Sequence, residues 1–190
     1  MKNLIMFLGL TLAVSTLSAQ TEIKPTIGIN FANVSGDPEN GTVKGTAGWQ
    51  IGGSVEFGNK VYGEIGVLYV KESSEFTSTS PDYEDLDFNQ KGFRIPVNIG
   101  WNILGSMESD FNIHAIGGGS AYFLTGSDGL DKDDLEGTQW GVFAGAGVDL
   151  WIFFIDLTYE WSLTDVETVT EFNLGKTHAF FANAGVRFRL

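Results

Sequence analysis

The 190-residue sequence has no cysteine, only 4 prolines, and only 11 lysines and arginines against 24 aspartates and glutamates. Without cysteine, the chain can form neither a disulfide nor a lipid anchor through a cysteine. The net charge of −13 argues against nucleic-acid binding, because phosphate contacts need clustered lysine and arginine. Beyond the N-terminus no run of about 18 apolar residues occurs, so we expect no transmembrane helix.

The N-terminus has the pattern of a secretory signal peptide. Residues 1–3 form a short basic end, residues 4–14 form an apolar run, and small residues then lead to Ala19. The apolar run is too short to cross about 30 Å of hydrocarbon as a helix. We therefore predict a signal peptide over residues 1–19 and one mature domain over residues 20–190.

The mature sequence alternates between apolar and polar residues with a period of two, which is typical of strands with two different faces. Eight segments show the pattern, and at about 12 to 17 residues they exceed the usual globular strand of about 5–6. Tilted membrane strands need about 9–11 residues in the hydrocarbon alone, so these lengths fit a barrel whose strands project beyond it. The predicted strands span residues 22–34, 44–57, 60–72, 88–104, 110–125, 137–150, 152–163 and 177–190.

The predicted connections alternate between short and long. Short turns at one end and long loops at the other are typical of outer-membrane barrels, whose short turns are periplasmic. With eight strands, both termini then lie in the periplasm. The long connections lie outside the cell, and they carry most of the acidic residues. The short turns lie near residues 58–60, 105–109 and 151, and the long connections near residues 35–43, 73–87, 126–136 and 164–176.

One face of the predicted strands is apolar and carries all five tryptophans near strand ends. Tryptophan is enriched where a membrane meets water, so this placement predicts two aromatic girdles. A soluble β-sandwich or calycin-like barrel, with its apolar face turned inward, is the rival fold. The girdles are Trp49, Trp140 and Trp161 at the loop end, and Trp101 and Trp151 at the turn end.

The opposite face carries charges in mid-strand, separated by many glycines. In a narrow barrel, small residues leave room for long side chains to interdigitate. Because unpaired buried charges are costly, we predict a lumen filled by a charge network with a structural role. Its predicted members are Arg94, Arg187, Arg189, Glu56, Glu64, Asp156 and Glu160. We also expect bulges or kinks at Pro96 and at Gly117 to Gly119.

Several short motifs resemble the PorT-like family of outer-membrane β-barrel proteins, which is typical of Bacteroidetes-type bacteria. The chain departs from that family at Thr158, where the family often has arginine. The resemblance implies a barrel over the whole mature chain and describes architecture more than activity. The motifs are residues 27–30 with 33–36, residues 92–97, and residues 143–150 followed by 155–159.

These observations predict an all-β, eight-stranded antiparallel up-and-down transmembrane β-barrel of the OmpA/OmpX type in the bacterial outer membrane. We expect no catalytic, cofactor-binding or metal site. The acidic stretch 128–136 lacks the EF-hand order of ligands. Expected partners are outer-membrane lipid and lipopolysaccharide, the barrel-assembly machinery, and an extracellular or envelope protein.

The expected role is structural or one of surface interaction, and two alternatives stay open. A small solute pore or transporter requires an unobstructed lumen. An outer-leaflet lipid enzyme requires a histidine near the outer rim, for which His178 is the candidate.

Overall fold

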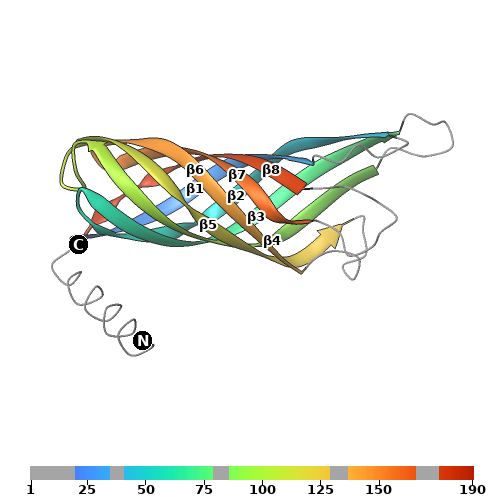
Figure 1. Cartoon of the computed structure of the whole chain (residues 1–190), viewed down its shortest axis with the longest axis horizontal. Coiled ribbons are helices and arrows are strands. Elements are labelled where there is room, and N and C mark those ends of the chain that lie inside the picture. The colour runs from blue at the N-terminus through green and yellow to red at the C-terminus, as the bar shows by residue number, and fades with distance from the viewer. Residues whose placement is uncertain (1–19, 35–40, 79–85, 129–136, 166–175) are drawn as a thin grey trace, which may run out of the picture.

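The alternating segments form long antiparallel strands, and each pairs with the next along the chain. The last strand pairs back onto the first, so the sheet closes into a barrel (Figure 1). This computed structural model describes residues 20–34, 41–78, 86–128, 137–165 and 176–190. The predicted signal peptide lies outside the described residues.

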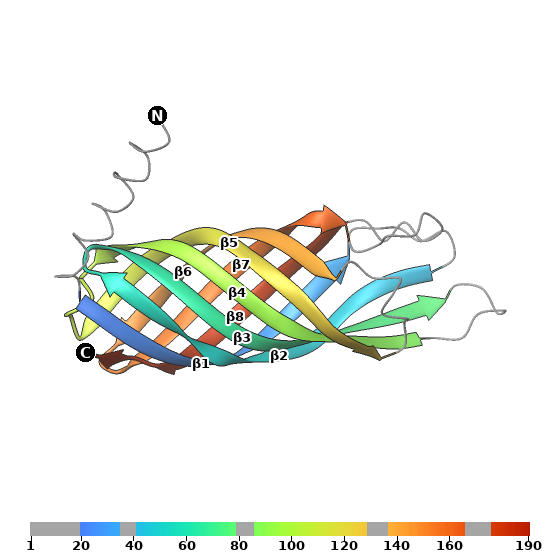
Figure 2. The ribbon, with the colours of Figure 1, turned by 90° about the horizontal axis from the view of Figure 1, so that it is seen from below.

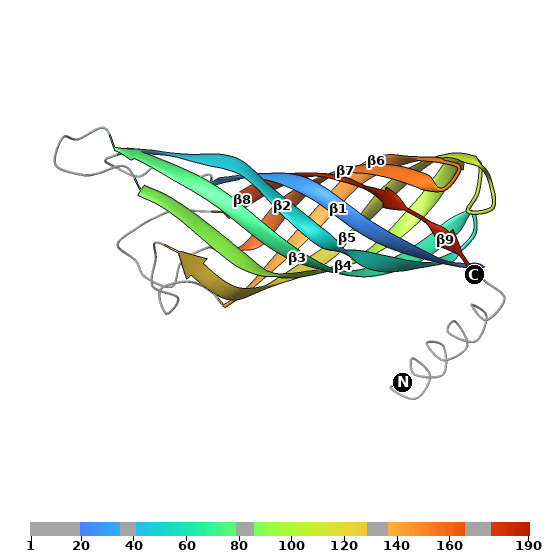
Figure 3. The same cartoon turned by 180° about the vertical axis from the view of Figure 1, so that it is seen from behind.

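The predicted eight-stranded antiparallel barrel is confirmed. A break at Arg187 divides the eighth strand into β8 and β9, both of which pair with β1. Figure 3 shows β9 beside the start of β1, at the end of the barrel where the C-terminus lies. The strands are β1 (Gln20–Val34), β2 (Gly41–Gly58), β3 (Val61–Ser78), β4 (Leu86–Leu104), β5 (Phe111–Asp128), β6 (Thr138–Leu150), β7 (Phe153–Asp165), β8 (Lys176–Val186) and β9 (Phe188–Arg189).

The predicted boundary between strand and long connection is wrong at β3 and β4. Most of the predicted connection 73–87 is paired, with Glu75 opposite Asp87 and Phe76 opposite Leu86. The predicted strands end at residue 72 and begin again at residue 88, but the serines and threonines between them are compatible with strands when a partner strand lies alongside. As a result, β2, β3 and β4 project furthest from the barrel (Figure 2).

The bulges predicted at Pro96 and at Gly117 to Gly119 are also wrong. Pro96 lies opposite Ser120, and the register of β5 with β6 runs without a shift from Phe111 to Phe123. Of the three glycines, Gly118 permits a close backbone approach instead of a kink. A Cβ atom added to Gly118 would lie 2.1 Å from the Val97 carbonyl oxygen. The register shifts occur elsewhere, at Thr46/Trp49, Lys91/Gly92, Asn102/Leu104 and Trp161/Asp165.

The two faces of the sheet differ as the alternation predicts. Large apolar side chains cover the outside, among them Ile99 and Trp101, which are 68% and 56% exposed. Polar and charged side chains such as Lys24 and Asp156 are buried inside the barrel. An apolar belt around a closed sheet is the surface that lipid covers in an outer-membrane barrel. No helix in the described part of the chain is long and apolar enough to cross a membrane.

The lipid-facing assignment makes a stability prediction at Val97, which is exposed midway between Phe93 and Trp101 on β4. We expect Val97→Arg to lower the free energy of unfolding in phosphatidylcholine vesicles by about 2–4 kcal/mol, because arginine is costly at the bilayer midplane. The same change at Ile103, near the turn end, should cost about 0–1 kcal/mol. Denaturant titration would measure both, and equal costs would contradict the assignment.

Candidate functional site

The charged lumen is the candidate site, and Lys24 lies near its centre. Lys24 is 2% exposed and comes from β1. Its Nζ lies 2.8 Å from Glu56 Oε1 on β2 and 3.3 Å from Asp156 Oδ2 on β7. It also lies 4.1 Å from the centre of the Phe154 ring. One ammonium group therefore links β1 with its neighbour β2 and with β7, which lies two strands away around the wall.

His114 on β5 extends this network toward the turn end. Its Nε2 lies 2.9 Å from Asp156 Oδ1, and its Nδ1 lies 3.6 Å from Asp149 Oδ2. Asn112 Nδ2 donates hydrogen bonds to Asp149, at 2.8 Å, and to Asn102 Oδ1, at 2.6 Å. The carboxylates of Asp149 on β6 and Asp156 on β7 are thus both held by side chains from β5.

Arg187 closes the turn end of the lumen. Its Nη1 lies 3.3 Å from Asp149 Oδ2 and 3.7 Å from Glu22 Oε2. The guanidinium also donates to the backbone oxygens of Trp151, at 2.9 Å, and Ser109, at 2.5 Å. Arg187 thereby ties the β4–β5 turn and the β6–β7 turn to the barrel wall.

The β4–β5 turn itself fills the turn-end mouth. Met107, in this turn, is only 2% exposed. It packs with Tyr62 and Ile116, which are buried in the lumen. The Met107 backbone oxygen lies 3.4 Å from Arg187 Nη1. An apolar side chain therefore enters the lumen from this end, and an arginine holds its turn in place.

Arg94 forms a second charged group farther toward the loop end. It pairs with Glu160 of β7, with Arg94 Nε 3.0 Å from Glu160 Oε2. Its guanidinium lies 5.1 Å from the centre of the Phe143 ring and 4.4 Å from that of Phe181. Aromatic faces attract a desolvated guanidinium. This arginine is therefore held by both charge and ring contacts.

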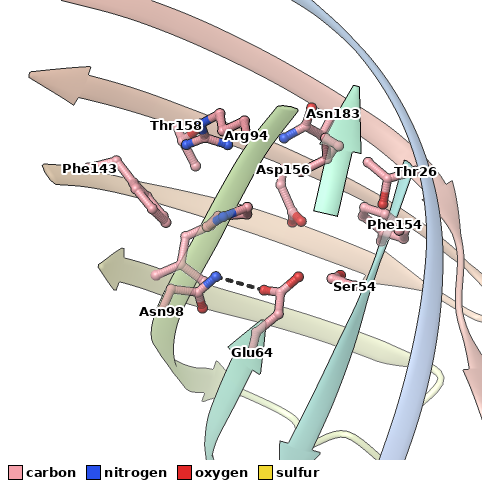
Figure 4. A pocket seen from close by; sticks show the side chains of 14 residues that line it. Thr26, Ser54, Glu64, Arg94, Asn98, Phe143, Phe154, Asp156, Thr158 and Asn183 are labelled. Atoms are coloured by element: carbon pink, nitrogen blue, oxygen red, sulfur yellow. Dashed lines mark hydrogen bonds between the residues drawn. The ribbon is translucent and has the colours of Figure 1, made fainter. Parts of the chain in front are cut away.

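A small cavity separates the two charged groups. Figure 4 shows Glu64, Asn98 and Asp156 around it, and Asn98 Nδ2 donates to Glu64 Oε2 at 2.9 Å. Its volume is about 40 Å³, room for about two or three water molecules by the usual measure. Asn98 Oδ1 and Thr158 Oγ1 have no protein partner, so water is the natural occupant. The cavity is too small to serve as a bore.

Apolar side chains fill the lumen beyond Arg94. Leu68 and Val70 of β3 pack against Tyr122 and Leu124 of β5, and all four are buried. The predicted charge network does not include this apolar cluster. The signal was present, because these residues share the inward parity of Glu64 on β3 and of His114 on β5.

The structure brings some predicted network members together and separates others. Arg94 and Glu160 form a pair, whereas Glu56 and Asp156 meet at Lys24. Glu64 accepts a hydrogen bond from Asn98. Arg187 contacts Asp149 and Glu22. Arg189 is 40% exposed, and its Nε lies 3.1 Å from Glu22 Oε1.

Four important lumen residues lie outside the predicted network: Glu22, Lys24, His114 and Asp149. The alternation of β1, with Ile23 and Ile27 outward, could have placed Glu22 and Lys24 inside. Which carboxylate each cation meets across the lumen could not be predicted, because that depends on the tilt and stagger of the strands.

The five predicted girdle tryptophans all lie on the outside of the barrel, each at least 41% exposed. Trp49 contacts Tyr69, with ring centres 5.7 Å apart, and Trp161 contacts Tyr159 at 4.9 Å. Trp151 lies in the β6–β7 turn with φ of 57°. They occupy both ends of the barrel wall.

His178, the candidate for an outer-leaflet enzyme, also lies on the outside of the wall. Its ring stacks on Tyr159 at 6.1 Å, and it lies opposite Trp161 in the register. In the described part of the chain, no three histidine, aspartate or glutamate side chains are grouped to hold a metal ion.

Comparison with known families gives a match over most of the chain. The family described as "Outer membrane protein beta-barrel domain" matches residues 18–167. No curated protein is significantly similar in sequence.

Solved structures of small outer-membrane barrels resemble this fold at low sequence identity. The outer membrane protein OprG from Pseudomonas aeruginosa superposes with a TM-score of 0.59 at 10% identity, covering 90% of this chain and 96% of OprG. Ail of Yersinia pestis, solved with the heparin analogue sucrose octasulfate, superposes with a TM-score of 0.45 at 15% identity, covering 90% of this chain and 99% of Ail. The N-terminal barrel of Pseudomonas aeruginosa OprF superposes with a TM-score of 0.40 at 11% identity, covering 90% of this chain and 100% of the OprF domain. At these identities the likeness concerns the fold alone.

The pair of Arg94 and Glu160 predicts a strong coupling. We expect Arg94→Met to lower the free energy of unfolding by about 3 kcal/mol, because it leaves a largely buried carboxylate without its cation. Adding Glu160→Gln should recover part of the loss. A double-mutant cycle by urea unfolding would measure this, and strictly additive effects would show that the pair does not act as a unit.

Proposed function

Because the chain belongs to the outer membrane protein beta-barrel domain family, we propose that this small outer-membrane β-barrel is non-enzymatic and has a structural or surface-interaction role. The filled lumen is the observation that carries the proposal. Lys24, Arg94 and Arg187 each bridge to carboxylates across it, and the cavity between them measures only about 40 Å³. Solute passage would require breaking these contacts.

Breaking them is costly, and this argues against the alternative of a small pore or transporter. Separating Lys24 from Glu56 and Asp156 would leave buried charges without partners, and such losses cost several kcal/mol each. The turn-end mouth is also occupied by Met107. We therefore favour a barrel that works through its outer surfaces.

The same proposal includes an orientation and a route of export. With the signal peptide over residues 1–19 removed, both termini lie in the periplasm and the long acidic connections lie outside. There they meet lipopolysaccharide and, in our proposal, an extracellular or envelope protein, after insertion by the barrel-assembly machinery. Membership of the PorT-like group within the family is part of this proposal, on the motifs described above.

A non-enzymatic role also fits the position of His178. Its ring packs on Tyr159 beside Trp161, as an interfacial aromatic does. An outer-leaflet lipid enzyme would instead need a nucleophilic side chain held against the His178 ring.

We expect the purified barrel to give no stable, large conductance in planar lipid bilayers, because side chains such as Lys24, Arg94 and Arg187 fill the part of the lumen that the structure describes. A general porin reconstituted in the same bilayers is the positive control. Stable, large conductance steps from the folded protein would overturn the proposal in favour of a pore.

The orientation can be tested by cysteine labelling, since the chain has no cysteine of its own. A Cβ atom added at Gly137, at the loop end, meets nothing within 4 Å, so Gly137→Cys should fold normally. A membrane-impermeant maleimide should label it on intact cells. Lys60→Cys, exposed in the β2–β3 turn, should react only after lysis, and the reverse pattern would invert the orientation.

A further inference from the structure

Two buried carboxylates face each other inside the barrel, Glu64 of β3 and Glu56 of β2, which are directly opposite in the register. Lys24 Nζ lies 2.8 Å from Glu56 Oε1 and is shared with Asp156. It attracts Glu64 only from a greater distance. The close contact of Glu64 is with the neutral amide of Asn98. Like charges directly opposite each other destabilise a sheet, so this pair needs more positive charge than Lys24 alone supplies.

Carboxylates outnumber cations in the lumen between the cavity and the turn end. Even with a proton on both ring nitrogens of His114, one negative charge has no counter-charge. Buried charge without a partner is costly, so one additional positive charge would stabilise this part of the barrel. The carboxylates are Glu22, Glu56, Glu64, Asp149 and Asp156, and the cationic groups are Lys24, His114, Arg187 and Arg189.

Oxygen atoms gather around the cavity beside Glu64. Figure 4 shows the second Glu64 oxygen, the Asp156 carboxylate and the Ser54 hydroxyl turned toward one another around it. Ser54 is 8% exposed, and its hydroxyl has no hydrogen-bond partner among the described residues. Thr158 Oγ1, also in the cavity wall, is likewise buried without a protein partner. Buried polar groups are normally satisfied, so these two hydroxyls indicate a polar occupant.

Arg94 also lines the cavity, but its charge is already balanced. Its Nε lies 3.0 Å from Glu160 Oε2. Its guanidinium also lies 4.4 Å from the centre of the Phe181 ring. The described wall of the cavity therefore supplies no further cation to Glu64.

The size and the charge of the site favour a small monovalent cation. The cavity of about 40 Å³ has room for two or three water molecules, and a sodium ion is no larger than one of them. Hard cations take oxygen ligands. Water alone would satisfy the hydroxyls but would leave the surplus charge. A divalent ion would exceed that charge, and the described residues contain no group of three acidic or histidine side chains to hold one.

We propose that the lumen cavity binds one sodium ion, held by Glu64, Asp156 and Ser54, with water as its further ligands. The ion takes the place of one of the water molecules for which the cavity has room. It joins β2, β3 and β7 inside the barrel, as Lys24 joins β1, β2 and β7. This site goes beyond the surface role proposed above. The ion is structural, because buried side chains fill the described lumen on both sides of it.

Unfolding of the purified full protein in phosphatidylcholine vesicles tests the site. Urea titrations are run at one pH and one ionic strength, with sodium chloride replaced stepwise by N-methylglucamine chloride. Because sodium binds the folded barrel, a tenfold rise in its concentration should raise the ratio of folded to unfolded protein about tenfold once the site is mostly occupied. The large organic cation does not fit the cavity and should have no such effect.

Glu64→Gln is the decisive variant, because glutamine keeps the shape and still accepts the Asn98 hydrogen bond but carries no charge. Its stability should not depend on sodium, and without sodium it should be at least as stable as the wild type. Ser54→Ala, which removes a neutral ligand, should need more sodium for the same stabilisation. Glu108→Gln, exposed in the β4–β5 turn, is the matched control and should respond to sodium as the wild type does.

The results distinguish this site from its rivals. Equal stability of the wild type in sodium and in N-methylglucamine would overturn the proposal, and a rise in that stability at lower pH would then assign the missing charge to a proton. A sodium dependence that survives in Glu64→Gln would place the ion elsewhere. A stronger effect of magnesium, also abolished in Glu64→Gln, would overturn the assignment to a monovalent ion. Heat-modifiable gel migration establishes that each variant is folded before titration.

Discussion

Closure of the sheet is the constraint on which the rest of this structure depends. In hydrocarbon, backbone N–H and C=O groups have no water to bond, so a membrane-spanning sheet must leave no open edge. Here β1 meets β2 on one side and β8 with β9 on the other. Where the eighth strand breaks at Arg187, its N–H donates to the Ile152 carbonyl oxygen at 2.7 Å. The backbone N–H at this irregular position therefore still has a hydrogen-bond acceptor in the backbone.

A barrel of only eight strands has a narrow lumen. Charged side chains inside it are buried, so each must lie next to a group of opposite charge. Among the described residues, the buried cations Lys24, Arg94 and Arg187 each reach a carboxylate on a strand that is not a neighbour in the sheet. Lys24 of β1 connects β2 with β7, Arg94 connects β4 with β7, and Arg187 connects the β8–β9 junction with β6. Because these contacts cross the lumen, they hold distant strands together where neighbouring-strand pairing cannot.

The sequence predicted what depends on strand parity and missed what depends on barrel geometry. A period of two fixes the face of each residue once the strand is recognised, so the apolar outside, the tryptophans and the inward Arg94 and Glu160 followed directly. Cross-lumen partners depend on stagger and tilt, which no single strand encodes. The parity of β1 could have placed Lys24 inside, but not its contacts with Glu56 and Asp156, two members of the predicted network.

Two predictions were wrong because they considered single residues and not the pairing of whole strands. Pro96 and the glycines at 117–119 were given conformational roles, but closure keeps the register intact through them. Gly118 instead allows the Val97 backbone to approach. In the same way, residues 73–87 were assigned to a connection, although β3 and β4 continue their pairing as far as Phe76 and Leu86.

The two surfaces of the wall stabilise the barrel in different ways. Inside, cations and carboxylates meet across the lumen, as Arg94 and Glu160 do. Outside, the surface is apolar and aromatic, with Val97 and Trp101 exposed on β4 and Tyr159 in contact with Trp161 on β7. The inner contacts therefore join strands that do not pair with each other, whereas the outer surface matches the lipid and the interface around it.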